Sequence, residues 1–247
     1  MNANRQTTVI QGNNKERNMK ITAASLIRWA GLSVMVAGIC YVLVGMFHPV
    51  NVLASVTTTR WAIVHVLASA MCFFGLFGIT GIYARQVEKT GWLGLVGYLL
   101  LSLWLVLITG FTFVEVFILP LLATTAPTFV EGFLGVFSSS ASAMNLNALS
   151  TIWTLTAPLY MLGGLLFGIA TFRAGILPRW AGILLAVGTA LTPVAALLPP
   201  ELQPKVAVPV GLALAWLGYA LWSERREQTS EPVPSRTSPQ LRQTAAE

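Results

Sequence analysis

Six long apolar segments run along this chain, and the short segments between them carry nearly all of its charged residues. A helix needs about 20 apolar residues (roughly 17–25) to cross the bilayer core, and five of the segments have such a length while the third is longer. No strand-like alternation of polar and apolar positions suggests a β-barrel, and a helix satisfies its backbone amides internally in hydrocarbon. The pattern therefore predicts an all-α polytopic membrane protein, a bundle of six transmembrane helices at about residues 29–47, 61–83, 92–119, 151–172, 180–198 and 206–222.

The segments outside this bundle differ in composition. Residues 1–28 form a polar N-terminal segment, residues 29–222 the transmembrane domain, and residues 223–247 a tail rich in Pro, Ser, Thr, Glu and Arg that we expect to be disordered. The connection 120–150 contains an apolar stretch, PTFVEGFLGVF, which is too short to span. It is compatible with a re-entrant segment or with a helix lying flat at the interface, and Glu131 favours the flat helix because an acid is costly at depth.

The composition agrees with a membrane protein and fixes an expected orientation. The chain of 247 residues is 55% hydrophobic and 10% charged, with a mean hydropathy of +0.71; soluble domains carry about 25% charged residues. If the N-terminus is cytoplasmic, all of the 15 lysines and arginines except Arg60 and Lys205 fall on the inner side. The positive-inside rule then predicts that both termini are cytoplasmic. The net charge of +6 is explained by this topology and by attraction to anionic lipid, so no nucleic-acid partner is predicted.

The candidate functional residues are expected near one membrane interface, the outer one. The chain has no aspartate, and Glu115 is the one glutamate well inside an apolar segment. His48 follows the first segment, while Arg60 and His65 open the second, so the topology brings them to the same outer level as Glu115. An ionisable side chain inside a membrane is a functional candidate by default. We therefore predict an outer-face site in which Glu115 and His65 bind a polar group, Arg60 counters its charge and Thr112 orients Glu115.

Three functions remain open for this site. The leading prediction is a non-enzymatic membrane protein that binds a lipid, a small molecule or a cation, with proton relay between Glu115 and His65 as one form of it. The alternative is a membrane enzyme that uses His48, His65 and Glu115 as ligands of zinc or haem iron, although their spacing matches no metal motif. The third is a structural subunit, in which these side chains tie helices together within a homo- or hetero-oligomer. Cys40 and Cys72 both lie inside apolar segments, where small inert packing residues are expected.

A resemblance to known proteins rests on short motifs between residues 25 and 222. These are His48-Pro49, Arg60-Trp61, His65, Tyr83-Ala84-Arg85 and Leu177-Pro178-Arg179-Trp180. With them the chain resembles a class of uncharacterised bacterial integral membrane proteins. The resemblance implies a six-helix protein of the bacterial inner membrane, and it carries no activity with it.

Overall fold

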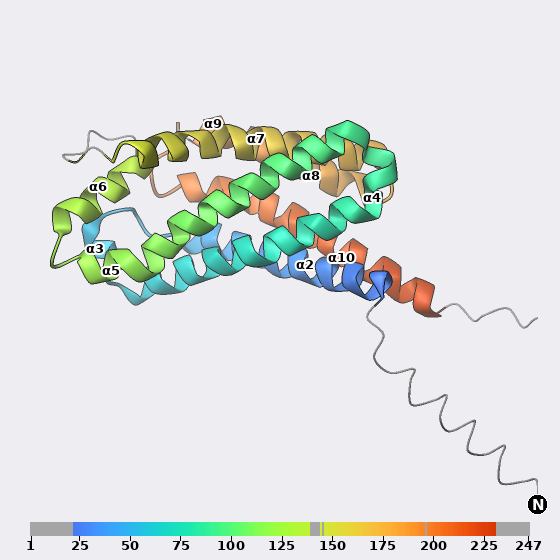
Figure 1. The fold of residues 1–247 in the computed structure, drawn as a ribbon, viewed down its shortest axis with the longest axis horizontal. Helices are drawn as coiled ribbons and strands as arrows, with labels where there is room; N and C mark the ends of the chain where they lie inside the picture. Colours follow the sequence, from blue (N-terminus) through green and yellow to red (C-terminus); the bar gives the residue numbers. More distant parts are fainter. Residues whose placement is uncertain (1–21, 139–143, 145, 196, 231–247) are drawn as a thin grey trace, which may run out of the picture.

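The computed structural model describes residues 22–138, 144, 146–195 and 197–230, and in these residues the fold is all-helical (Figure 1). Long helices lie side by side in a bundle, and short helices close one of its ends. In chain order the helices are α2 (Ala23–Phe47), α3 (Leu53–Val56), α4 (Thr59–Phe113), the π-helical turn η2 (Val114–Ile118), α5 (Leu119–Leu122), α6 (Pro127–Ser138), α7 (Ala148–Ala174), α8 (Arg179–Ala190), α9 (Thr192–Ala195), the 3₁₀ turn η3 (Gln203–Ala207) and α10 (Val208–Ser230).

Helix α4 is a hairpin of two antiparallel arms. Its direction reverses at Gly91, whose backbone has φ 53° and ψ −151° inside an otherwise helical segment. A residue with a side chain is strained in that region, so glycine is the residue that permits the reversal. Tyr83 and Tyr98, one on each arm, stack with their ring centroids 4.8 Å apart. The predicted second and third spans are therefore the two arms of one continuous element.

Four helices of the described residues are long and apolar enough to cross a membrane: α2, the segment Thr59–Leu122 built on α4, α7, and Gln203–Ser223 of α10. The chain is thus a helical multi-pass membrane protein. The predicted fifth span differs, because α8 ends at Ala190 and continues only as the short α9, in which Pro193 lacks an amide hydrogen. Helix α2 begins at Ala23, inside the predicted N-terminal segment 1–28, and helix α10 extends to Ser230, so the first eight residues of the tail 223–247 are helical and not disordered as predicted. The remaining parts of these two predicted segments, residues 1–21 and 231–247, lie outside the described residues.

Glycines set the close approach of the helices. A side chain at Gly38 of α2 would meet the backbone of α10, 2.5 Å from the nitrogen of Ala215, and one at Gly168 of α7 would meet the carbonyl oxygen of Gly182 in α8 at 2.5 Å. The small-residue pattern Gly164–Gly168 therefore packs helices of the same chain. Along the outside of the bundle large apolar side chains stay exposed, among them Ile39, Phe73, Phe77, Leu103, Phe117 and Leu212. An exposed apolar surface of this extent suits acyl chains as its solvent.

The two ends of the bundle have different chemistry. At one end, called the basic end, lie the start of α2, the bend of α4 and the end of α10 (Figure 1, right). Basic residues gather there, and three tryptophans at this end are largely exposed, as an interfacial belt requires: Trp29 at 66%, Trp92 at 80% and Trp180 at 70%. The opposite end, called the cap end, carries α3, α5 and α6 (Figure 1, left). Glu131 on α6 is exposed, whereas Val130, Phe133 and Leu134 are buried against the bundle.

Candidate functional site

The predicted site lies at the cap end, where the second arm of α4 loses its regular hydrogen bonding. At η2 the amide of Leu119 donates to the carbonyl oxygen of Val114 rather than to that of Glu115. The next amide in line for the Glu115 carbonyl belongs to Pro120, which has no hydrogen to donate. The carbonyl oxygen of Glu115 is thereby left without a backbone partner in a buried segment, which costs free energy unless another donor reaches it.

Trp61 supplies that donor from the first arm of α4. Its side chain is fully buried, and its indole Nε1 donates to the carbonyl oxygen of Glu115 at 2.8 Å. The same ring stacks on His65, one helical turn further on, with centroids 3.9 Å apart and an interplanar angle of 27°. The sequence analysis gave Trp61 no part in the site and missed this role. The signal was its spacing, since residues i and i+4 share a helix face and Trp61 must lie beside His65.

His65 and Glu115 form the centre of the site. Both are buried, at 1% and 7% exposure, and His65 Nε2 lies 3.5 Å from Glu115 Oε1. The other ring nitrogen, Nδ1, lies 2.8 Å from the carbonyl oxygen of Trp61, so it carries a hydrogen and donates it there. Nε2 has no hydrogen-bond partner in the described part of the chain. A buried ring nitrogen of His65 therefore faces a buried carboxyl group.

His48 and Arg60 lie at the rim of this centre. The His48 ring meets His65 edge-on with centroids 5.1 Å apart, and its Nδ1 lies 2.7 Å from the carbonyl oxygen of Pro49. Burial lowers the pKa of His48 from its usual 6.5 to about 4; His65 and Arg60 add to this effect, and the hydrogen bond to Pro49 opposes it. His48 is therefore neutral near pH 7. Arg60 is exposed, and its Nε donates at 2.9 Å to the carbonyl oxygen of Phe47, the last residue of α2.

The remaining predicted side chains have local partners. Thr112 is buried, at 4% exposure, and its hydroxyl donates to the carbonyl oxygen of Thr109 at 3.1 Å. As for a metal, no group of three or more His, Cys, Asp or Glu side chains among the described residues is placed to hold one. His48, His65 and Glu115 thus lie close together without forming a set of metal ligands. Nδ1 of His48 faces the carbonyl oxygen of Pro49, and the His48 ring contacts the His65 ring edge-on. As placed here, these residues do not supply the ligand set that a zinc ion needs.

Comparisons with known proteins add no assignment. Neither the protein-family models, nor the curated proteins, nor the solved structures contain a match to this chain. The resemblance noted in the sequence therefore stays a prediction, and the function has to be inferred from the site itself.

Proposed function

We propose that this chain is a six-span protein of the bacterial inner membrane, with both termini in the cytoplasm and lipid around its apolar surface. The six crossings would be α2, the two arms of α4, α7, the α8–α9 pair and α10. The gathering of Arg28, Arg85, Lys89, Arg173 and Arg179 toward the basic end supports this orientation, because positive charge is retained on the cytoplasmic side. In this arrangement the cap end, with His65 and Glu115, faces outward.

We further propose that the outward site binds and releases a proton, which is the simplest cation that fits it. The observation that carries the proposal is the unpartnered Nε2 of His65 facing Glu115 Oε1 at 3.5 Å. Since Nδ1 already carries a hydrogen, a neutral imidazole presents a bare lone pair at Nε2. A bare carboxylate opposite that lone pair would leave a net negative charge buried, which is costly in a low-dielectric site. One proton held between Nε2 and Oε1 removes this cost, and the pair then exists as His⁺–Glu⁻ or as its neutral form.

The surroundings favour a proton over larger ligands. A metal cation needs several oxygen, nitrogen or sulfur ligands, and this centre offers one nitrogen and one carboxyl group. The competing function is a structural one, in which the pair serves only to hold the arms of α4 together. It is favoured by the backbone contacts of Trp61 and Arg60, which tie η2 and the end of α2 to the start of α4. The two functions differ in one measurable respect, which is whether the proton on Nε2 exchanges with bulk water at ordinary pH.

Nitrogen NMR on the full-length protein in lipid nanodiscs, with ¹⁵N-labelled histidine, tests this difference. The chain has two histidines, so His48→Gln and His65→Gln variants assign every signal. We expect Nδ1 of His65 to keep its hydrogen throughout, while Nε2 changes from protonated to bare within the titration. Glu115→Gln removes the carboxylate that faces Nε2, so it should change the Nε2 signal of His65 relative to the unmodified protein.

The matched control is Glu131→Gln, which removes the same charge from an exposed position on α6. It should leave the His65 titration unchanged. If Nε2 of His65 keeps one protonation state across the whole pH range and Glu115→Gln lowers only thermal stability, the site is structural and the proposed function is wrong.

A further inference from the structure

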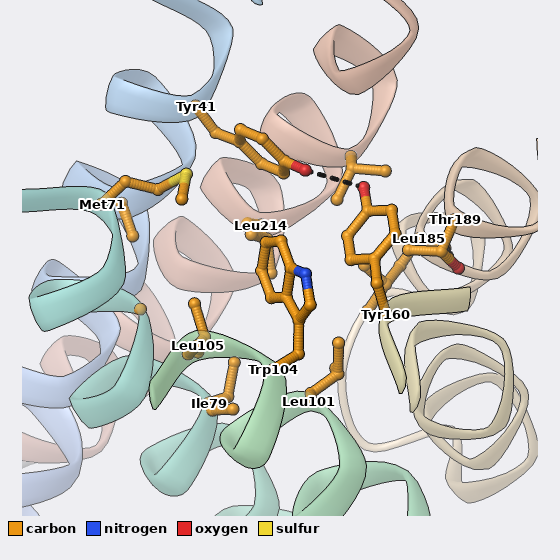
Figure 2. Close-up of a pocket in the computed structure, with 13 residues that line it drawn as sticks. Tyr41, Met71, Ile79, Leu101, Trp104, Leu105, Tyr160, Leu185, Thr189 and Leu214 are labelled. Carbon is orange, nitrogen blue, oxygen red and sulfur yellow. Dashed lines mark hydrogen bonds between the residues drawn. The ribbon is translucent and has the colours of Figure 1, made fainter. Parts of the chain in front are cut away.

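A second polar contact lies inside the bundle, away from His65 and Glu115. A partly open cavity of about 30 Å³ lies between α2, α4, α7, α8 and α10. Figure 2 shows its lining, in which apolar side chains such as Met71, Ile79 and Leu105 surround the ring of Trp104. Above that ring the hydroxyl of Tyr41 on α2 meets the hydroxyl of Tyr160 on α7 at 3.0 Å (Figure 2). Such a cavity has room for one or two water-sized molecules, and its apolar lining favours a dry state.

The two tyrosines also line a larger pocket on the side toward the cap end. This pocket has a volume of about 140 Å³. Besides Tyr41 and Tyr160 it is lined by Thr192 and Ala195 near α9 and by Gln203 and Pro204 of η3, all in the connection from α8 to α10. The tyrosine pair therefore stands between a small inner cavity and a wider outer pocket. Trp104 is adjacent to both rings, with centroids 4.6 Å from Tyr160 and 6.3 Å from Tyr41.

One of the two hydroxyl hydrogens of Tyr41 and Tyr160 is not used in the bond between them. Two tyrosine hydroxyls carry two hydrogens, and only one of them can lie between the two oxygens. The bond between Tyr41 and Tyr160 uses that one, and within the described residues the second makes no other hydrogen bond that we observe. Tyr160 is 8% exposed, so this donor is buried at a place where lost hydrogen bonds are costly. Both tyrosines line the outer pocket, so a hydroxyl hydrogen of the pair is within reach of an acceptor brought by a ligand.

We propose that the Tyr41–Tyr160 pocket is a binding site for a small, flat, mostly apolar molecule of about one ring that carries a single hydrogen-bond acceptor such as a carbonyl. The size follows from the volumes, because an apolar cavity of about 150 Å³ holds benzene, and the outer pocket has about 140 Å³. The ring class follows from the aromatic wall of Trp104 and the tyrosines, which favours offset or edge contacts with another ring. The acceptor follows from the spare hydroxyl hydrogen.

This site is independent of the proposed proton site. His65 and Glu115 line neither the inner cavity nor the outer pocket. A failure of ligand binding would leave the titration of His65 untouched, and a failure of that titration would leave this pocket in place.

The test uses two molecules of the same shape on the full-length protein in detergent. Acetophenone carries a ring and a carbonyl oxygen, and α-methylstyrene replaces that oxygen with a methylene group. Binding is measured by calorimetry against a protein-free micelle blank, which accounts for partition into detergent. We expect acetophenone to bind about three- to tenfold more tightly than α-methylstyrene, as one hydrogen bond to a buried donor allows. In the double variant Tyr41→Phe/Tyr160→Phe, which removes both hydroxyl groups, this preference should disappear while the rings remain.

Two further variants locate the ligand. Ala195→Phe fills the outer pocket from α9 while both tyrosine hydroxyl groups stay in place, and it should abolish binding of both molecules. Tyr219→Phe removes a hydroxyl from a position that is 56% exposed on α10 and should change nothing. Equal affinity of the two molecules for the unmodified protein, no binding of either, or full binding to Ala195→Phe would each overturn the proposal. The comparison of the two molecules on the unmodified protein decides the matter even if a variant fails to fold.

Discussion

Trp61 offers the sharpest test of how the cap end is stabilised, because its indole replaces a backbone hydrogen bond that Pro120 cannot make. The perturbation is a double-mutant cycle of Trp61→Phe and Pro120→Ala. Trp61→Phe keeps an aromatic ring on His65 but removes the donor to the Glu115 carbonyl. Pro120→Ala returns an amide hydrogen at the position where η2 needs one. The two changes therefore act on the same carbonyl oxygen from opposite sides.

The magnitude follows from the burial of that carbonyl. Leaving a buried acceptor unsatisfied costs about 1–3 kcal/mol, and the smaller ring adds about 1 kcal/mol for lost packing. Trp61→Phe should thus lower the free energy of unfolding by about 2–4 kcal/mol in the natural background. In the Pro120→Ala background the restored amide satisfies the carbonyl, so the cost should fall to about 1 kcal/mol, the packing part alone. The difference is the coupling between the two sites.

The assay is reversible unfolding in mixed micelles, followed by circular dichroism as sodium dodecyl sulfate is titrated. Trp92→Phe is the control, since Trp92 is 80% exposed, and it should stay within about 0.5 kcal/mol of the unmodified protein. If Trp61→Phe costs the same in both backgrounds, to within about 0.5 kcal/mol, the indole does not substitute for the missing amide and the explanation given for η2 is wrong.

Two further predictions concern helix packing and pH. Gly38→Ala should destabilise the fold by at least about 2 kcal/mol, because the new methyl group meets backbone atoms of α10 at 2.5 Å. Gly110→Ala is the control: its methyl group enters open space, so this change should be neutral or stabilise the fold by up to about 1 kcal/mol. Thermal unfolding of both variants tests this prediction. The pKa of His48 in the folded protein, about 4, lies below its value in the unfolded chain, so the unfolded chain binds a proton on this residue at a higher pH than the folded protein does. The free energy of unfolding should therefore decrease by about 2 kcal/mol between about pH 7.5 and about pH 5. His48→Gln should remove this part of the pH dependence.

The long helices could be predicted from the sequence because a continuous run of apolar residues is enough to indicate them. In hydrocarbon the backbone of such a run has to pair its polar groups within the segment, which a helix does, and α2, α7 and α10 lie where these runs were found. The fifth span was harder to predict, since a hydropathy pattern does not show that α8 stops at Ala190 shortly before Pro193. The short helix α6 was anticipated as a segment too short to span, and its exposed Glu131 agrees with the reason given for it.

The site was predictable only in its approximate position. Topology placed His48, Arg60, His65 and Glu115 at one level, but it does not fix the rotation of a helix about its own axis. That rotation decides that His65 faces Glu115, while Thr112 donates to the backbone of its own helix. The pocket at Tyr41 and Tyr160 escaped prediction for the same reason, since two tyrosines on different helices, far apart in the sequence, reveal no contact until the helices are packed.

One connected set of interactions joins the backbone irregularity to the proposed chemistry. Pro120 lacks an amide hydrogen, η2 shifts the pairing of Leu119, and the orphaned carbonyl of Glu115 fixes the indole of Trp61. Trp61 then holds His65 twice, through ring stacking and through its own carbonyl oxygen at Nδ1. These two contacts fix the imidazole tautomer and leave Nε2 as the nitrogen that faces the carboxyl group. The π turn and the proton site therefore form a single unit, and a change at Pro120 should alter the nitrogen NMR signals of the His65 ring although the two side chains have no direct bond.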